Sequence, residues 1–200
     1  MKKILTLAAV LLLALVSGCA DWNKNARVLL YPAAEGKGLY GYHVYAGAGT
    51  LETKDYKLIV KQVRPGDELG EPRIVTDLLE RRYIVLMFAI ENRSANKITF
   101  NPARTALTTD EFDYKKPLEY PDFYELSEGK NDRAKERDAG EMKGRFYDST
   151  LTVVPGEKTS RMLIYPPLTG SSEKADLLIK DLYIGTDTEE IYFPFAIKAE

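Results

Sequence analysis

The fold class that the sequence predicts is all-β, an antiparallel β-sandwich. Seven or more short segments rich in β-branched and aromatic residues are separated by turn residues such as Gly, Pro and Asn. Several segments alternate apolar and polar residues with a period of two, as strands with one buried face do. The 13 tyrosines suit half-buried, pleated surfaces. Together these observations predict a single sandwich domain.

The first 18 residues predict a lipoprotein signal peptide. Lys2 and Lys3 form a positive region, and an almost unbroken apolar run of 13 residues follows them. That length suits the hydrophobic region of a signal peptide, whereas a membrane-spanning helix needs roughly 20 residues. The run ends in Val16-Ser17-Gly18-Cys19, which resembles the lipobox of bacterial lipoproteins. The competing interpretation is an ordinary secretory signal with a chance cysteine.

The lipobox resemblance implies that the chain is cut between Gly18 and Cys19 and that Cys19 carries the lipid. Residues 19–26 are then a lipidated N-terminus and a short polar tether. Two or more acyl chains hold such a protein stably, because each buried CH₂ contributes about 0.8 kcal/mol. In this group an aspartate directly after the cysteine favours retention in the inner membrane. Ala20 therefore implies the outer membrane, with the domain facing the periplasm.

Turn residues separate six expected strands in the first half of the domain, which is expected over 27–200. These strands cover 27–32, 56–61, 83–90, 97–101, 105–109 and 112–118. In the second of them, Tyr56, Leu58 and Val60 alternate with lysines, which indicates one solvated face. The third is apolar on both faces, which predicts a central strand covered on both sides. The polar turn at 92–96 predicts a hairpin between the strands that flank it.

The second half contains four more expected strands, at 151–154, 161–165, 177–184 and 191–199. The Pro155-Gly156-Glu157-Lys158 turn joins the first two. In the last strand, Ile191, Phe193, Phe195 and Ile197 share one face. Pro194 interrupts its other face and lacks an N–H donor, which predicts an edge strand or a bulge.

Two sequence stretches resemble immunoglobulin-like domains of bacterial envelope lipoproteins. Tyr83-Ile-Val-Leu-Met-Phe-Ala-Ile-Glu-Asn92 with Ile98-Thr-Phe-Asn-Pro102 is similar to their central hairpin, and Val154-Pro-Gly-Glu157 with Arg161-Met-Leu-Ile-Tyr165 is similar to a later one. The resemblance covers roughly Lys54 to Lys198 and implies an immunoglobulin-like sandwich. It departs from that group in its charged insertion and in lacking a disulfide between the sheets. It implies no particular activity or site.

An insertion at about 120–146 interrupts the strand pattern. Residues 120–126 predict a short helix with Phe123 and Tyr124 as apolar contacts. In 128–145, 11 of 18 residues are charged, six basic and five acidic. Such a run is either a mobile, solvated loop or helix outside the core, or an element that docks a partner. Its candidate partner contacts are Glu128, Lys130, Arg133, Lys135, Arg137 and Arg145.

Composition excludes several kinds of chemistry. Loss of Lys2 and Lys3 with the signal peptide changes the formal charge from −2 to −4, and no basic stripe indicates nucleic-acid binding. Cys19 is the only cysteine and His43 the only histidine. Once lipid occupies the thiol, no disulfide, cysteine nucleophile or ordinary zinc site can form within one chain. We therefore expect no metal and no cofactor.

Three motif matches have simpler explanations than catalysis. Gly36-Lys-Gly-Leu-Tyr-Gly41 matches G-x-G-x-x-G, but a dinucleotide site needs a helix after it, and the next residues predict an extended chain. Ser94 and Ser171 each start an S-x-x-K match without the supporting motifs of penicillin-recognising enzymes. His43 lies among Tyr40, Tyr42 and Tyr45, where it is expected to pack without a nucleophile.

The function that these observations favour is a non-enzymatic binding or assembly module of the cell envelope. Its expected partners are the membrane, through the lipid, and an envelope protein or glycan. The alternative is a carbohydrate-handling or hydrolytic accessory protein that uses carboxylates with the tyrosines around His43.

Overall fold

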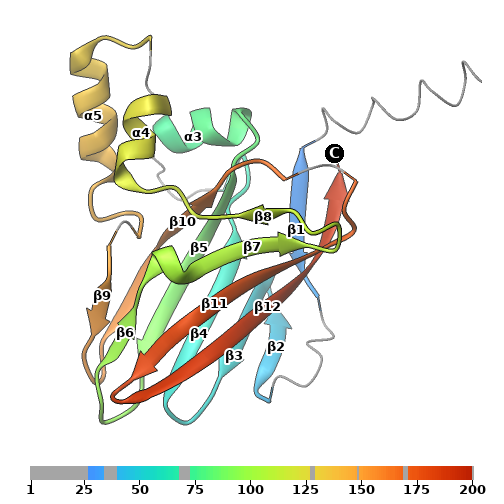
Figure 1. The fold of residues 1–200 in the computed structure, drawn as a ribbon, viewed down its shortest axis with the longest axis vertical. Helices are drawn as coiled ribbons and strands as arrows, with labels where there is room; N and C mark the ends of the chain where they lie inside the picture. Colours follow the sequence, from blue (N-terminus) through green and yellow to red (C-terminus); the bar gives the residue numbers. More distant parts are fainter. Residues whose placement is uncertain are drawn as a thin grey trace, which may run out of the picture.

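The computed structural model describes residues 27–33, 40–67, 73–126, 129–147, 149–168 and 171–199. Within them, two antiparallel sheets pack face to face and three helices cover one end (Figure 1), which confirms the all-β sandwich. The seven-stranded sheet contains β1 (Val28–Pro32), β12 (Asp187–Ala199), β11 (Lys174–Ile184), β6 (Ile98–Phe100), β9 (Leu151–Val153), β7 (Thr105–Thr109) and β8 (Tyr114–Lys115). The five-stranded sheet contains β10 (Lys158–Tyr165), β5 (Ile84–Asn92), β4 (Tyr56–Gln62), β3 (Ala48–Glu52) and β2 (Tyr42–Tyr45).

Alternating residues of both sheets form the sandwich core. Leu58 and Val60 of β4 are fully buried, whereas Lys57 before them is half-exposed and Lys61 after them is exposed, as the period of two predicts. Phe88 of β5 packs on Phe100 of β6 with ring centroids 5.1 Å apart, and so joins the two layers. Fully burying one such side chain stabilises the fold by roughly 1.5–3 kcal/mol.

β5 is covered on both faces, as expected. Leu86 and Phe88 point into the sandwich, whereas Val85 belongs to a second apolar cluster outside it. Three helices close that cluster over the sheet: α3 (Arg73–Glu80), α4 (Tyr120–Leu126) and α5 (Asp132–Met142). We call these helices the helical cap. The α4 helix was expected, whereas α3 was not, because eight residues with four buried ones give a short pattern.

The two expected hairpins are wrong. β5 pairs with β4 and β10, whereas β6 pairs with β11 and β9 in the opposite sheet. In the same way β9 and β10 lie in different sheets although only a turn separates them. Both connections are crossovers of a sandwich. A strand–turn–strand pattern does not say which layer the second strand joins, because either layer buries its apolar face.

Pro194 does not mark an edge strand or a bulge. β12 lies between β1 and β11, and its register shift falls at Ile179/Leu182 of the partner strand, away from the proline. The N–H of Ala33 donates to the Pro194 carbonyl at 2.9 Å, just beyond the last paired residue of β1. Pro194 therefore lies opposite the end of β1. The N–H that it lacks costs one hydrogen bond at the end of the β1–β12 pairing and none in its middle.

Two other predicted segments differ from the structure, one in its length and one in its burial. The strand expected at 112–118 is reduced to β8, because Phe112 has a φ of +62° and turns the chain. The charged run at 128–145 contains α5, and this helix buries Asp138, Ala139 and Met142. It lies outside the sandwich core but completes the second cluster, so it is not a wholly solvated segment. Replacing it with a Gly/Ser linker would uncover that cluster.

Candidate binding surface on the helical cap

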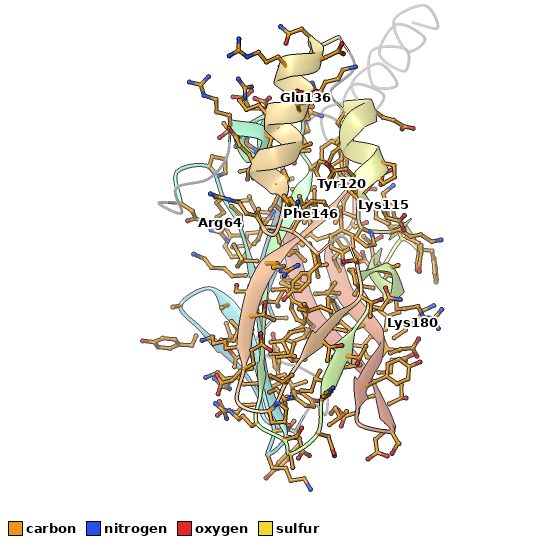
Figure 2. All side chains as sticks on the ribbon, turned by 90° about the vertical axis from the view of Figure 1, so that its left-hand side faces the viewer. Arg64, Lys115, Tyr120, Glu136, Phe146 and Lys180 are labelled. Atoms are coloured by element: carbon orange, nitrogen blue, oxygen red, sulfur yellow. The ribbon has the colours of Figure 1, made fainter. Side chains whose placement is uncertain are left out.

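The α5 helix begins and ends at clear local signals. The side chain of Asn131 accepts a hydrogen bond from the Ala134 N–H at 2.9 Å, which caps the first turn. Gly144 with a φ of +75° turns the chain after the last turn. Phe146 then packs on Phe123 of α4 at 4.6 Å between ring centroids. Figure 2 shows Tyr120 beside Phe146 where α5 meets the sandwich.

An ion-pair network around the buried carboxylate of Asp138 fixes α5 against α3. The Lys130 ammonium lies 2.9 Å from a carboxylate oxygen of Asp77 and 2.8 Å from one of Asp138. Arg137 adds a contact of 2.9 Å to the other oxygen of Asp138. The Asp138 side chain is only 2% exposed, so both cations are needed to offset its desolvation. The network therefore holds two surface helices in one arrangement.

The pKa directions agree with this network. Burial opposes ionisation of Asp138, but the hydrogen bonds and charges of Lys130 and Arg137 outweigh it and hold the pKa of Asp138 below its usual value. Hydrogen bonds to Asp138 and then Asp77 raise the pKa of Lys130. Asp138 and Lys130 are thus both ionised at neutral pH.

The structure separates the expected partner contacts into two groups. Lys130 and Arg137 take part in the internal network, and Lys135 is half-buried. Arg133 is exposed and, with Asn131, Ala134 and Arg137, surrounds an open depression of about 530 Å³ on the outer side of α5. Arg145 supports the sheet, because its carbonyl accepts the Met162 N–H at 2.8 Å. Glu128 lies outside the described residues.

A groove between β8 and α4 was not expected from the sequence. It has a volume of about 490 Å³ and is lined by Tyr83, Tyr114, Lys115, Lys116, Pro117, Leu118, Asp122, Glu125, Leu126 and Pro166. Lys115 pairs with Asp113 at 2.9 Å, and Lys180 lies 6.0 Å from the centre of the Tyr114 ring. The only sequence signal for it is the Tyr114-Lys-Lys-Pro117 stretch beside a helix start.

The surroundings of His43 do not form a convergent site. His43 lies on β2, where Tyr42 points inward and contacts Phe193 edge-on at 6.2 Å. Tyr40 and Tyr45 are 93% and 77% exposed. Burial raises the pKa of the Tyr42 hydroxyl, which has no hydrogen-bond partner among the described residues. The tyrosines therefore do not gather around the histidine.

Local geometry explains two of the motif matches. Gly41 has a φ of +83°, and an added Cβ would lie 2.0 Å from the Glu52 carbonyl oxygen, so the turn itself requires glycine. Strand β2 follows it, where a dinucleotide site needs a helix. The Ser94 hydroxyl donates to Asn92 and Asn96 oxygens within the crossover. Residues 34–39 lie outside the described part of the chain.

No family model matches the sequence, and no curated protein matches it. Among solved structures, the chain is similar to the yjhA protein from Bacillus subtilis, with 14% identity and a TM-score of 0.42, over 72% of this chain and 93% of that one. It is also similar to a functionally unknown protein from Listeria monocytogenes EGD-e, with 10% identity and a TM-score of 0.40, over 87% and 90%. Neither similarity bears on activity.

The described ranges hold neither a metal-binding cluster nor a membrane-spanning helix. No group of three or more His, Cys, Asp or Glu side chains in these ranges is arranged to hold a metal ion. No helix there is long and apolar enough to cross a bilayer. The proposed cleavage site at Gly18, the lipid site at Cys19 and the tether at 19–26 all lie outside the described residues.

Proposed function

We propose that the protein is a lipid-anchored binding module of the bacterial cell envelope, without catalytic activity. The anchor is Cys19, and its support is the order of positive residues, apolar run, Ser17-Gly18 and cysteine. With Ala20 after the cysteine, the module belongs on the outer membrane and faces the periplasm. The binding role is supported by the helical cap.

The observation that carries the binding role is the fixed position of α5. Lys130 joins Asp77 of α3 to Asp138 of α5, so the outer face of α5 is held without help from a partner. A preorganised surface loses little conformational entropy on binding. Arg133 on that face is exposed and Asn131 beside it supplies polar groups, which suits a polar partner surface that carries carboxylates.

Cross-linking in intact cells tests this role. The wild-type protein should capture an envelope partner, and Arg133→Glu should lose it while the domain stays folded. His43→Ala and Lys54→Glu are the controls, since His43 lies on β2 and the Lys54 side chain is 91% exposed in a turn of the sandwich. Retention of every partner by Arg133→Glu, or loss by the Lys54→Glu control alone, would overturn the assignment to α5.

Glycan binding is a second candidate, and the β8–α4 groove is the observation that favours it. The groove combines Tyr83 and Tyr114 with Asp122 and Glu125, so aromatic rings and hydrogen-bond acceptors line one hollow. Sugar rings stack on aromatic faces while their hydroxyls bond to carboxylates. Under this candidate Tyr114→Ala would reduce retention on isolated cell-wall glycan, and Arg133→Glu would not.

A further inference from the structure

We propose that the tether end of the domain docks on anionic phospholipid headgroups through a basic cluster of Arg27, Arg64 and Lys198. This docking rests on the proposed lipid anchor at Cys19 and adds a second contact with the same membrane. The cluster lies beside the first described residue, where the tether enters the domain.

A hollow beside the start of β1 presents two of these cations. It has a volume of about 350 Å³ and is lined by Arg27, Arg64, Pro65, Gly66, Asp67, Thr76, Leu79 and Glu80. The Arg27 guanidinium donates to the Leu79 carbonyl at the end of α3, at 3.5 Å. Arg64 also lines the hollow, and its backbone N–H donates to the Asp67 carboxylate at 3.0 Å across the turn at Pro65-Gly66.

Tyr31 holds two of the cations without neutralising them. The guanidinium carbon of Arg64 lies 4.3 Å from the centre of the Tyr31 ring, and the Lys198 ammonium lies 4.9 Å from it. Cation–π contact orients a positive group but leaves its charge available. Among the described residues, no carboxylate forms an ion pair with Arg27, Arg64 or Lys198, whereas Arg93 and Arg104 elsewhere do pair with carboxylates.

The acidic groups nearby do not cancel this charge. Asp67 and Glu80 also line the hollow. Asp67 is partly neutralised by Lys61, whose ammonium lies 3.8 Å from it. Around the hollow and the Tyr31 ring, the described cations Arg27, Arg64, Lys61 and Lys198 thus lie with the carboxylates of Asp67 and Glu80. At the opposite end, the β11–β12 turn is followed by Asp187, Glu189 and Glu190, and Lys97 lies beside this turn, where its carbonyl accepts the Gly185 N–H.

Chain lengths place the headgroups at the basic end. Residues 19–26 span at most about 28 Å when fully extended. β12 has 13 residues, which corresponds to about 40 Å of strand. Val28 pairs with Ala199 at one end of β12, and the Gly185 turn lies at the other end (Figure 1). An anchored domain therefore reaches the membrane with its basic cluster first.

The length of the tether and the charge of the basic cluster together predict how the anchored domain is oriented on the membrane. They do not predict that the cluster brings the domain to the membrane. Screening limits the attraction to about 10 Å from the surface at moderate salt, so the lipid must first bring the domain close. Three cations next to an anionic leaflet then favour the docked orientation. Each one should change the ratio of docked to undocked domain about fivefold.

Thiol labelling can measure the orientation, because Cys19 is the only cysteine and lipid occupies it. Thr76→Cys in the hollow and Thr186→Cys in the far turn each give one labelled site. The lipidated protein is placed in vesicles of phosphatidylcholine alone or mixed with phosphatidylglycerol, with a quencher on the lipid headgroups. We expect phosphatidylglycerol to increase quenching at position 76 and not at position 186, and high salt to reverse the increase.

Matched variants decide between docking and general attraction. Arg64→Gln and Lys198→Gln should each lower the docked ratio about fivefold, whereas Lys97→Gln and Lys158→Gln should leave it unchanged. Equal quenching in both vesicle types, or equal effects of all four variants, would overturn the docking. Acyl labelling on the same samples reports the anchor separately. Loss of that label would overturn the anchor and the docking, while an intact label without orientation would overturn the docking alone.

Discussion

Asn92 and Val153 lie in opposite sheets, yet the side-chain amide of Asn92 donates to the Val153 carbonyl at 2.8 Å. The same amide donates to the Asn96 carbonyl, and its oxygen accepts from the Ser94 N–H and hydroxyl. Asn92 is fully buried. One side chain thus fastens both crossovers, β5 to β6 and β9 to β10, at the same end of the sandwich.

Asn92→Ala should lower the free energy of unfolding by about 3 kcal/mol, because it leaves several buried polar groups without partners. Urea unfolding measures the loss. Asn96→Ala is the control, since its side chain is exposed, and should change stability by less than about 0.5 kcal/mol. Equal losses in the two variants would mean that Asn92 does not join the crossovers.

A charge introduced on either face of β5 should lower the free energy of unfolding. Leu86→Asp puts a carboxylate in the sandwich core, and Val85→Asp puts one under the helical cap, and both sites are fully buried. Each should destabilise the domain by about 4 kcal/mol. Met87→Asp should cost less, because Met87 is half-buried. If chemical denaturation shows Val85→Asp to be harmless, the cap does not cover this face.

Acid should loosen the helical cap. The pKa of Asp138 lies below the ordinary value of 3.8, so its contribution to stability is complete above that value and disappears as the pH falls through the folded value. Asp138→Asn should remove this part of the pH dependence.

Lys130→Met should cost about 2 kcal/mol at neutral pH, since only Arg137 then pairs with the buried carboxylate. Unfolding curves measured over a pH series test both the Asp138→Asn and the Lys130→Met predictions. An acid transition that Asp138→Asn leaves unchanged would assign it to other carboxylates.

Cys19→Ser should abolish acyl labelling and leave an unprocessed precursor, because the lipid is attached through the thiol. Metabolic labelling with a fatty acid and the mass of the mature chain test this. A variant that still incorporates label to the wild-type extent would place the lipid at another residue.

Much of the fold followed from local pattern. The alternation at Tyr56, Leu58 and Val60 predicted that β4 has one solvated and one buried face. The apolar residues on both faces of β5 predicted that a second layer covers the face outside the sandwich. The α4 helix was predicted, while α3 was missed because eight residues carry little periodic signal. For the candidate surface, the charge of 128–145 pointed to α5 but could not separate exposed Arg133 from Lys130, which contacts α3.

The sequence by itself determined most strand positions, with β2 and β3 missed and β8 overextended, and also the central place of β5, the single cysteine and single histidine, and the expected anchor at Cys19. These features depend on residue type and on short-range periodicity. Only the tertiary structure decided that the turns at 92–97 and 154–157 cross between sheets, that α5 is held by Asp77, and that Arg64 and Lys198 share Tyr31. Each of these joins residues far apart in the chain, and local patterns carry no information about which distant surface will bury them.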